Sequence, residues 1–256
     1  MAFRFPDDVC LAYVREKIYN GAMDEKIRIN KYLSEAGFCS RREADSLIQE
    51  GRVTVDGRRA EPGEKITSDT VVYVDGKAVK KVEEKVLLLF YKPRGVVCST
   101  KKQRQETTVT EYLNYPLRVY PIGRLDKDSE GLLLLTNDGA FANALMHPKH
   151  EVEKAYLVQV SGYTPERFQQ LARPITLDGY RIKPPVLRLL AVKGDKCNFE
   201  IIIHEGRNRQ IRRMCEAAGM QVLRLRRIRE GAVTLGNLPL GKWRHLTREE
   251  VKELAR

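Results

Sequence analysis

The amino-acid sequence predicts an α+β protein made of two domains. Its 256 residues match the length of about two average domains and can bury at least one sizeable core. The apolar residues first follow a helical spacing and then alternate every second position, which is the spacing of strands. Farther along, the apolar runs 86–91 and 132–135 have the length of buried strands. We therefore expect a small domain of helices and strands followed by a larger one.

The small domain should begin with two short helices. An apolar stripe over 29–36 predicts the first helix, and Gly37 ends it as a C-cap. Ser40 and Glu43 have the spacing of a capping box, which predicts a second helix that runs to Gly51. Two type I′ hairpin dipeptides then follow alternating valines, Asp56-Gly57 and Asp75-Gly76. A helix pair followed by a small sheet is the expected architecture of this domain.

The charge indicates a polyanionic partner. The chain holds 46 Lys and Arg against 34 Asp and Glu, a net charge of +12, and most of the excess lies after residue 80. Nucleic acid is the leading candidate. Arg41 and Arg42 stand in the first turn of the second predicted helix, where free N–H groups favour an anion. The alternative is a solvated helix start that Glu43 and Asp45 balance in charge.

Nothing in the sequence indicates secretion or a membrane. No apolar run approaches the roughly 20 residues that a spanning helix needs, and residues 1–20 lack the apolar core of a signal peptide. The five cysteines are odd in number and form no CxxC pair, which favours a reduced compartment over disulfides or a zinc ribbon. We expect a cytoplasmic monomer with a dispensable extension at 1–25 and a linker at 79–85.

A polar loop before the second buried strand carries the candidate chemistry. It holds Arg124, Asp126, Asp128 and Glu130. Three carboxylates could form a metal site, although Arg124 and Lys127 among them and the lack of a histidine with ligand spacing argue against it. A merely solvated acidic loop is the other structural possibility.

Motifs along the chain resemble two known families. The segments RINKYL (28–33), GFCSRREA (37–44) and IQEGRVTVDG (48–57) resemble the S4 RNA-binding domain. The segment GRLDKDSEGLLLLTNDG (123–139) is similar to the signature of the RsuA/RluB/RluF branch of ribosomal RNA pseudouridine synthases. The other blocks of that branch occur in order as KPRG (92–95), KAYLV (154–158) and EGRNRQIRRM (205–214). The resemblance implies an S4 domain at 26–78 and, at 86–256, a catalytic domain with a mixed, mainly antiparallel sheet.

The resemblance also implies the catalytic residues. Asp126 would be the essential carboxylate, Tyr156 would stack on the flipped uracil, and Arg212 would keep Asp126 ionised. The sequence leaves open that Tyr156 is a core tyrosine and that Arg212 binds phosphate. Residues 207–229 hold eight arginines and one acid, a density that favours phosphate contacts. The residues expected to contact RNA are Lys31, Arg41, Arg42, Lys92, Arg124, Arg207, Arg209 and Arg213.

The implied reaction is the isomerisation of uridine to pseudouridine, which needs no cofactor and no metal. The implied partner is ribosomal RNA or a pre-ribosomal particle, with the large-subunit RNA favoured. Three alternatives remain at this point. One is a synthase of the same branch that acts on transfer RNA, one is a non-enzymatic RNA-binding module, and one is a metal-dependent nuclease that uses Asp126, Asp128 and Glu130.

Overall fold

The computed structural model describes residues 26–256 except 68, 81–83, 100–104, 148–151 and 256. The expected extension at 1–25 therefore lies outside the described residues, as does part of the expected linker at 79–85. The chain divides into two compact units. The first comprises 1–87 with 115–119 and 136–141, and the second comprises the remaining three stretches of the chain. The domain boundaries expected from the sequence stay a prediction.

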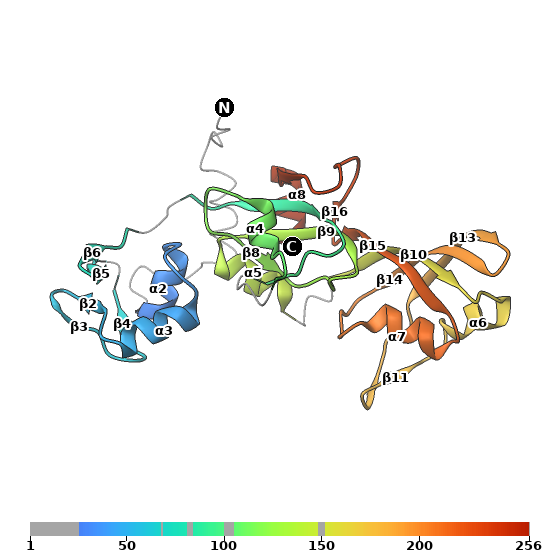
Figure 1. Ribbon diagram of the computed structural model, residues 1–256, viewed down its shortest axis with the longest axis horizontal. Coiled ribbons are helices and arrows are strands. Elements are labelled where there is room, and N and C mark those ends of the chain that lie inside the picture. The colour runs from blue at the N-terminus through green and yellow to red at the C-terminus, as the bar shows by residue number, and fades with distance from the viewer. Residues whose placement is uncertain (1–25, 68, 81–83, 100–104, 148–151, 256) are drawn as a thin grey trace. The chain divides into compact units, whose positions relative to one another are not determined.

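The first unit contains the expected helix pair and small sheet (Figure 1). Its elements are β1 (Ile27–Arg28), α2 (Ile29–Glu35), α3 (Arg41–Gln49), β2 (Val53–Val55), β3 (Arg58–Arg59), β4 (Lys65–Ile66), β5 (Val72–Val74) and β6 (Lys77–Ala78). The capping box of α3 is confirmed, because the Ser40 hydroxyl accepts from the Glu43 N–H and the Glu43 carboxylate accepts from the Ser40 N–H. Leu33, Ala44 and Val53 are fully buried where helices and sheet pack together.

The two hairpin dipeptides of the first unit adopt the predicted turns. Asp56 and Gly57 have φ of 47° and 86°, and Asp75 and Gly76 have φ of 50° and 75°, as a type I′ turn requires. The strands pair in the order β3-β2-β5-β6, with the valines of β2 and β5 facing the core. Local turn chemistry therefore sets the register of the two hairpins, β2–β3 and β5–β6.

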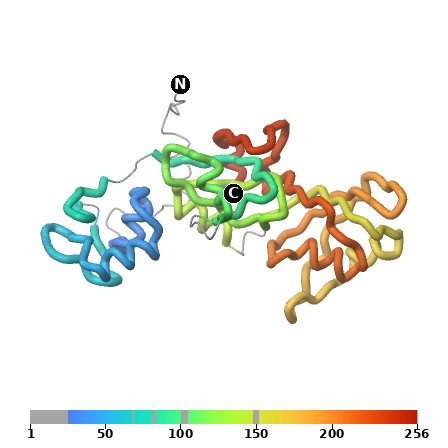
Figure 2. The backbone as a smooth tube through the Cα atoms, viewed as in Figure 1, coloured from blue at the N-terminus to red at the C-terminus, as the bar shows by residue number. Residues whose placement is uncertain are grey.

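The second unit is built on a large sheet, whose path is clear in the backbone trace (Figure 2). The strands are β7 (Leu87–Lys92), β8 (Tyr120–Ile122), β9 (Glu130–Thr136), β10 (Lys154–Ser161), β11 (Thr176–Leu177), β12 (Tyr180–Arg181), β13 (Val186–Lys193), β14 (Lys196–Ile203), β15 (Gln221–Glu230), β16 (Val233–Thr234) and β17 (Trp243–His245). The helices are α4 (Val109–Leu113), α5 (Gly139–Met146), α6 (Pro165–Gln170), α7 (Gln210–Ala217) and α8 (Arg248–Leu254).

The main path of this sheet runs β13-β14-β10-β15-β9-β7-β17. The pairs β13–β14, β14–β10, β10–β15 and β7–β17 are antiparallel, whereas β15 and β9 pair in parallel. The prediction of a mixed, mainly antiparallel sheet is therefore confirmed. Among the described helices, none combines the length and the apolar character that crossing a membrane requires.

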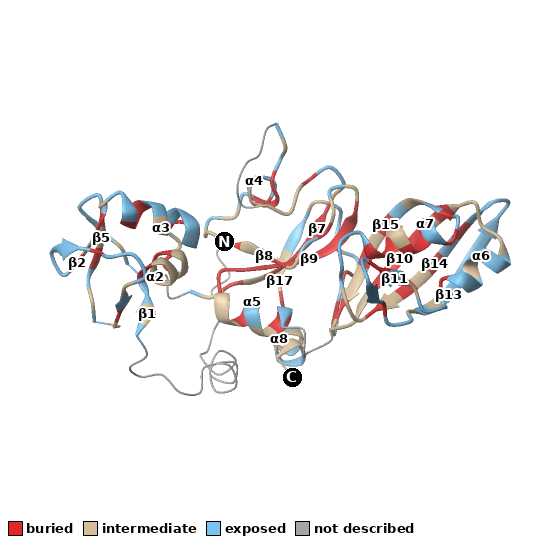
Figure 3. Ribbon diagram, turned by 90° about the horizontal axis from the view of Figure 1, so that it is seen from below, coloured by how far each residue is buried: buried red, intermediate tan, exposed pale blue. Residues whose placement is uncertain are grey.

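The parallel contact between β9 and β15 is short and unusually close. Only Glu130 with Arg226 and Gly131 with Arg227 are in register. Gly131 has φ +114°, and a Cβ placed on it would overlap the backbone of Arg227. All of β9 is buried, as its red ribbon in Figure 3 shows. Only glycine lets the two backbones approach this closely, and the contact brings the start of β9 against β15.

One local expectation for this region needs correction. Glu130 was placed in the polar loop, but it is the first residue of β9 and is buried. The next element begins soon after this strand, where the Asp138 carboxylate accepts from the N–H groups of Ala140 and Phe141 at the start of α5.

Candidate active site

A cleft of about 1200 Å³ lies within the second unit and collects five of the eight site residues expected in that unit. Its walls come from 120–129, the start of β10, residues 203–211 and β15. Asp126 and Tyr156 both line it, although 30 positions separate them in the chain. The sheet brings them together because β10 pairs with β15, and β15 pairs with the strand that follows the Asp126 loop.

Asp126 lies on a tight loop at the wall of the cleft. The Ser129 N–H donates to the Asp126 carbonyl at 3.0 Å and closes this turn. The Asp126 side chain is 30% exposed, so its carboxylate is open to the cleft but partly removed from water. The guanidinium of Arg209 lies 3.9 Å from it, and the same nitrogen lies 3.2 Å from the Asp128 carboxylate. The hydrogen bond from Arg209 lowers the pKa of Asp128 below its usual range.

Arg209 itself has an unusual backbone. It is the N-cap of α7 with φ 49°, a left-handed conformation that costs a non-glycine residue about 1–2 kcal/mol. Strain of this kind is common where function dictates a side-chain position. The arginine that directly contacts the candidate catalytic carboxylate is therefore held at a constrained helix start.

Arg212 contacts the loop that carries Asp126. Its Nη2 donates to the Asp128 carbonyl at 3.1 Å and to the Ser129 hydroxyl at 3.4 Å. Burial lowers the pKa of Arg212, while the charges of Asp128 and Asp126 oppose that shift. Among the described residues, the ion pair with the Asp126 carboxylate is made by Arg209. Arg212 thus holds the loop, and its expected role in keeping Asp126 ionised stays a prediction.

Tyr156 is part of the buried wall of the cleft. It belongs to β10, is 7% exposed, and burial raises the pKa of its phenol. Arg227 pairs with it in the register of β15. The Arg227 guanidinium is itself buried, donates from Nε to the Leu132 carbonyl at 2.7 Å and lies 3.3 Å from the Glu230 carboxylate. A buried charged residue therefore lies beside the tyrosine in the sheet.

Lys92 is not placed to contact a phosphate, contrary to the expectation. Its side chain is fully buried, and its ammonium donates to the Pro93 carbonyl at 3.0 Å and the Ser129 carbonyl at 2.8 Å. Burial lowers its pKa to about 8. Lys92 is the last residue of β7, and its hydrogen bond to the Ser129 carbonyl joins this strand end to the loop that carries Asp126.

The other residues expected to contact RNA fall into separate places. Arg124, Arg207 and Arg209 line the cleft and are exposed there. Arg213 does not line the cleft. Its guanidinium forms a bidentate ion pair with the Asp178 carboxylate, with hydrogen bonds of 2.7 and 2.8 Å. In the first unit, Arg41 and Arg42 are exposed on α3, and Lys31 lies 3.7 Å from Glu35. Their contacts with RNA stay predictions.

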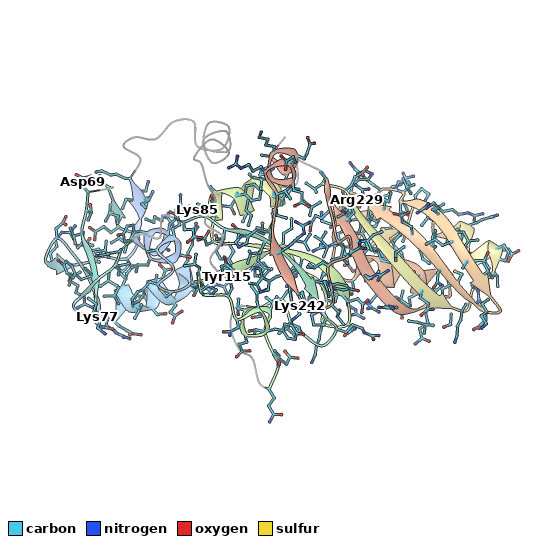
Figure 4. The ribbon with its side chains drawn as sticks, turned by 90° about the horizontal axis from the view of Figure 1, so that it is seen from above. Asp69, Lys77, Lys85, Tyr115, Arg229 and Lys242 are labelled. Atoms are coloured by element: carbon cyan, nitrogen blue, oxygen red, sulfur yellow. The ribbon has the colours of Figure 1, made fainter. Side chains whose placement is uncertain are left out.

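Most arginines of the segment 207–229 form ion pairs with acidic side chains of the same chain, which the sequence of the segment does not indicate. Arg229, marked in Figure 4, donates to Glu153 at 2.9 Å. Other pairs in the described chain join Arg207 to Glu205, Arg209 to Asp128, Arg213 to Asp178, Arg224 to Glu130 and Arg227 to Glu230. Four of these acids, Glu153, Asp128, Asp178 and Glu130, come from distant segments, so a count of charges within the segment could not reveal them.

Two of the three acids that suggested a metal site are paired with arginines. Asp128 pairs with Arg209, and the buried Glu130 pairs with Arg224 at 2.6 Å. Across the described part of the chain, no group of three His, Cys, Asp or Glu side chains is arranged to hold a metal ion. The nuclease alternative therefore finds no ligand set among these residues.

Sequence reasoning missed two contributors to the cleft. One is Arg227, whose burial depends on the parallel β9–β15 contact and has no local signature. The other is the β11–β12 hairpin, which brings Tyr180 to the cleft. Its turn residues Asp178 and Gly179 have φ of 52° and 76°, the same type I′ signal that correctly predicted the hairpins of the first unit.

The fold and the cleft together define an RNA-acting enzyme: a helix-pair module in the same chain as a catalytic unit with one carboxylate, a buried tyrosine and exposed arginines in a single cleft. Residues 86–217 match the family model described as RNA pseudouridylate synthase, and residues 27–72 match the S4 domain. The chain belongs to the RNA pseudouridylate synthase family.

Curated relatives and a solved structure agree with this assignment. The chain is 45% identical over 232 residues to the ribosomal large subunit pseudouridine synthase B of Bacillus subtilis (strain 168), covering 89% of this chain and 95% of that protein. It is 39% identical over 241 residues to the dual-specificity RNA pseudouridine synthase RluF of Escherichia coli (strain K12), covering 90% and 79%. A crystal structure of a pseudouridylate synthase matches with a TM-score of 0.64 at 31% identity, covering 89% and 99%. The chain is therefore a pseudouridine synthase.

Proposed function

We propose that this enzyme converts a specific uridine of large-subunit ribosomal RNA to pseudouridine, with Asp126 as its catalytic residue. The observation that carries the proposal is the position of Asp126 beside Arg209 in the cleft that Tyr156 also lines. The B. subtilis relative, named for the large ribosomal subunit, supports this substrate. We propose that the enzyme acts as a monomer in the cytoplasm.

The reaction moves one glycosidic bond and leaves the composition of the RNA unchanged. The bond from the ribose to uracil N1 breaks, the base turns, and the ribose carbon bonds to C5. C5 loses a proton and N1 gains one, so no electrons are exchanged with another molecule. The uridine must first leave its stack, which costs a few kcal/mol.

Asp126 meets the electrostatic demand of bond cleavage. Breaking the glycosidic bond develops positive charge on the sugar, and an ionised carboxylate beside the sugar stabilises that charge. The guanidinium of Arg209 lies 3.9 Å from the Asp126 carboxylate. Arg212 and Lys92 hold the loop through the Asp128 and Ser129 carbonyls, so the carboxylate is positioned before substrate arrives.

Tyr156 would contact the uracil once it is flipped. It lines the cleft, and its place in β10 leaves it only 7% exposed. An aromatic ring held in this way offers an apolar face for a planar base. The exposed Arg124 at the same cleft is suited to a flanking phosphate.

The test compares pseudouridine at single-nucleotide resolution in total RNA. The RNA comes from cells that carry the intact gene, a deletion, or the variants Asp126→Asn and Asp128→Asn. We expect one ribosomal uridine to lose its modification in the deletion and in Asp126→Asn. Asp128→Asn is the matched control, two residues away on the same loop, and should lower the rate without changing the site.

The outcomes separate the alternatives. An unchanged map in the deletion strain would refute the enzymatic proposal and favour an RNA-binding module. Loss at a transfer RNA uridine alone would replace the ribosomal substrate, and loss at both would match the dual specificity in the name of the E. coli relative. Urea unfolding of purified Asp126→Asn shows whether the variant is folded.

A further inference from the structure

An exposed aromatic residue at the cleft has no part in the chemistry proposed above. Tyr180, the first residue of β12, is 41% exposed and lines the cleft. The guanidinium of Arg207 lies over its ring, 3.3 Å from the ring centroid. Arg207 also lines the cleft and keeps 42% of its side chain exposed. The two planar groups thus form one stacked pair at the cleft surface.

The stacked pair is held in place by polar contacts from both sides. Arg213 of α7 makes two bonds to Asp178 in the hairpin turn. The Glu205 carboxylate accepts from the Arg207 Nε at 3.1 Å and from the Lys183 N–H, just after β12, at 3.1 Å. Such links position the pair before RNA binds, so that little conformational freedom is lost on binding.

The cleft has room for more than the reacting nucleotide. Its volume of about 1200 Å³ exceeds the roughly 300–1,000 Å³ of pockets that enclose drug-sized ligands. A single flipped uridine would leave part of this space unfilled. Arginine guanidinium planes and aromatic rings are the surfaces on which proteins stack unpaired RNA bases. A guanidinium already stacked on an aromatic ring keeps its other face for a base.

We propose that Tyr180 and Arg207 form a stacking platform for one nucleobase next to the uridine that reaches Asp126. This inference rests on the proposed function and deepens it, because it assigns a second base-binding subsite to the same cleft. The platform holds the neighbouring base out of the RNA stack and so stabilises the opened RNA. It contributes to substrate binding and takes no part in bond breaking.

The experiment pairs protein variants with modified RNA. The substrate is a short RNA around the uridine mapped above, made with an abasic residue at each flanking position in turn. The proteins are the full chain and its variants Tyr180→Ala, Tyr180→Phe and Arg207→Lys. Leu189→Ala is the control, because Leu189 is equally exposed at 41% but does not line the cleft. RNA binding is measured in an Asp126→Asn background, so it does not depend on turnover.

On intact RNA we expect Tyr180→Ala to weaken binding by about tenfold, which is the scale of one lost base stack. In the otherwise active enzyme, the same substitution should raise KM more than it lowers kcat. Tyr180→Phe and Leu189→Ala should bind as the parent does. Arg207→Lys keeps the charge but loses the plane, so it should weaken binding as Tyr180→Ala does. At one abasic position the effect of Tyr180→Ala should vanish, because the base that it contacts is gone.

Two results would overturn the platform. One is an equal effect of Tyr180→Ala on every abasic RNA. The other is parent-like binding by Arg207→Lys, which would make Arg207 a phosphate contact. Because binding is scored without turnover, these results decide the platform whether the mapped uridine lies in ribosomal RNA or in transfer RNA.

Discussion

Replacing Gly131 by alanine tests the close approach of β9 and β15, on which the site depends. Gly131 has φ +114°, outside the region that residues with a Cβ readily adopt. An added Cβ would overlap the Arg227 carbonyl oxygen and lie 2.6 Å from the Arg227 nitrogen. Both atoms belong to the backbone of a central strand, so neither can move without shifting the sheet.

The expected cost combines two contributions. Holding a non-glycine residue at this φ costs about 1–3 kcal/mol, and inserting a methyl group into packed backbone costs about 1–3 kcal/mol more. We take about 4 kcal/mol as the loss in the free energy of unfolding, a large part of the ~5–15 kcal/mol of a whole domain. With a urea m-value near ~2 kcal/mol/M, the unfolding midpoint should fall by about 2 M.

The fluorescence of Trp243 provides the assay. It is the only tryptophan of the chain, and β17 places it opposite Phe90 of β7 in the same sheet. Urea titration followed through Trp243 therefore reports the unfolding of the second unit. Gly236→Ala is the matched control, because Gly236 has φ +55° and nothing within 4 Å of the added Cβ. It should cost only about 1 kcal/mol, or a midpoint shift of about 0.5 M.

Equal midpoint shifts for Gly131→Ala and Gly236→Ala would refute this reasoning. They would mean that only the backbone conformation of Gly131 matters and that the close approach to Arg227 does not. If the approach does matter, Gly131→Ala should also lower the rate of pseudouridine formation in the folded protein. The added methyl group displaces the backbone of Arg227, which is the register partner of Tyr156 on β10.

Two further predictions concern buried titratable groups. The pKa of Lys92 is about 8 in the folded chain and ordinarily about 10.4, so the unfolded chain binds more protons between these values and native stability rises with pH. Lys92→Met should remove this rise in stability. The check is the urea unfolding midpoint of the parent and of Lys92→Met at pH 7 and at pH 9.5. If the midpoint changes equally with pH in both proteins, the ammonium of Lys92 is not buried as described. Burial raises the pKa of Cys197 to about 11 and of Cys215 to about 12, so both thiols stay protonated in the native chain at pH 8. Their stabilising contribution is present below about pH 8.5 and lost as pH rises toward the folded pKa values. Iodoacetamide should label these two thiols only as fast as the protein unfolds, which peptide mass spectrometry can measure. If the native chain is labelled as fast as the urea-unfolded chain, the thiols are accessible and the prediction is wrong.

Features that depend on neighbours in the chain were predictable. The capping box of Ser40 and Glu43 and the turns at Asp56-Gly57 and Asp75-Gly76 need only residues within four positions of one another, so the local pattern suffices. The same holds for the buried stripe of α7, where Ile211 and Met214 share a face. The motif around Asp126 was recognisable because its residues are contiguous.

The sequence by itself therefore determined the helix pair, its hairpins, the strand and helix types and the loop that carries Asp126. The tertiary structure alone decided which charges meet in the cleft. Arg209 and Asp128 are 81 positions apart, and Arg212 and the Asp128 carbonyl are 84 apart. Arg227 and the Leu132 carbonyl are 95 apart, and Lys92 is buried only because β7 ends beside Ser129. A side chain's charge is visible in the sequence, but its partner and its burial follow from how distant strands pack, because Coulomb and desolvation energies depend on distance and surroundings in space.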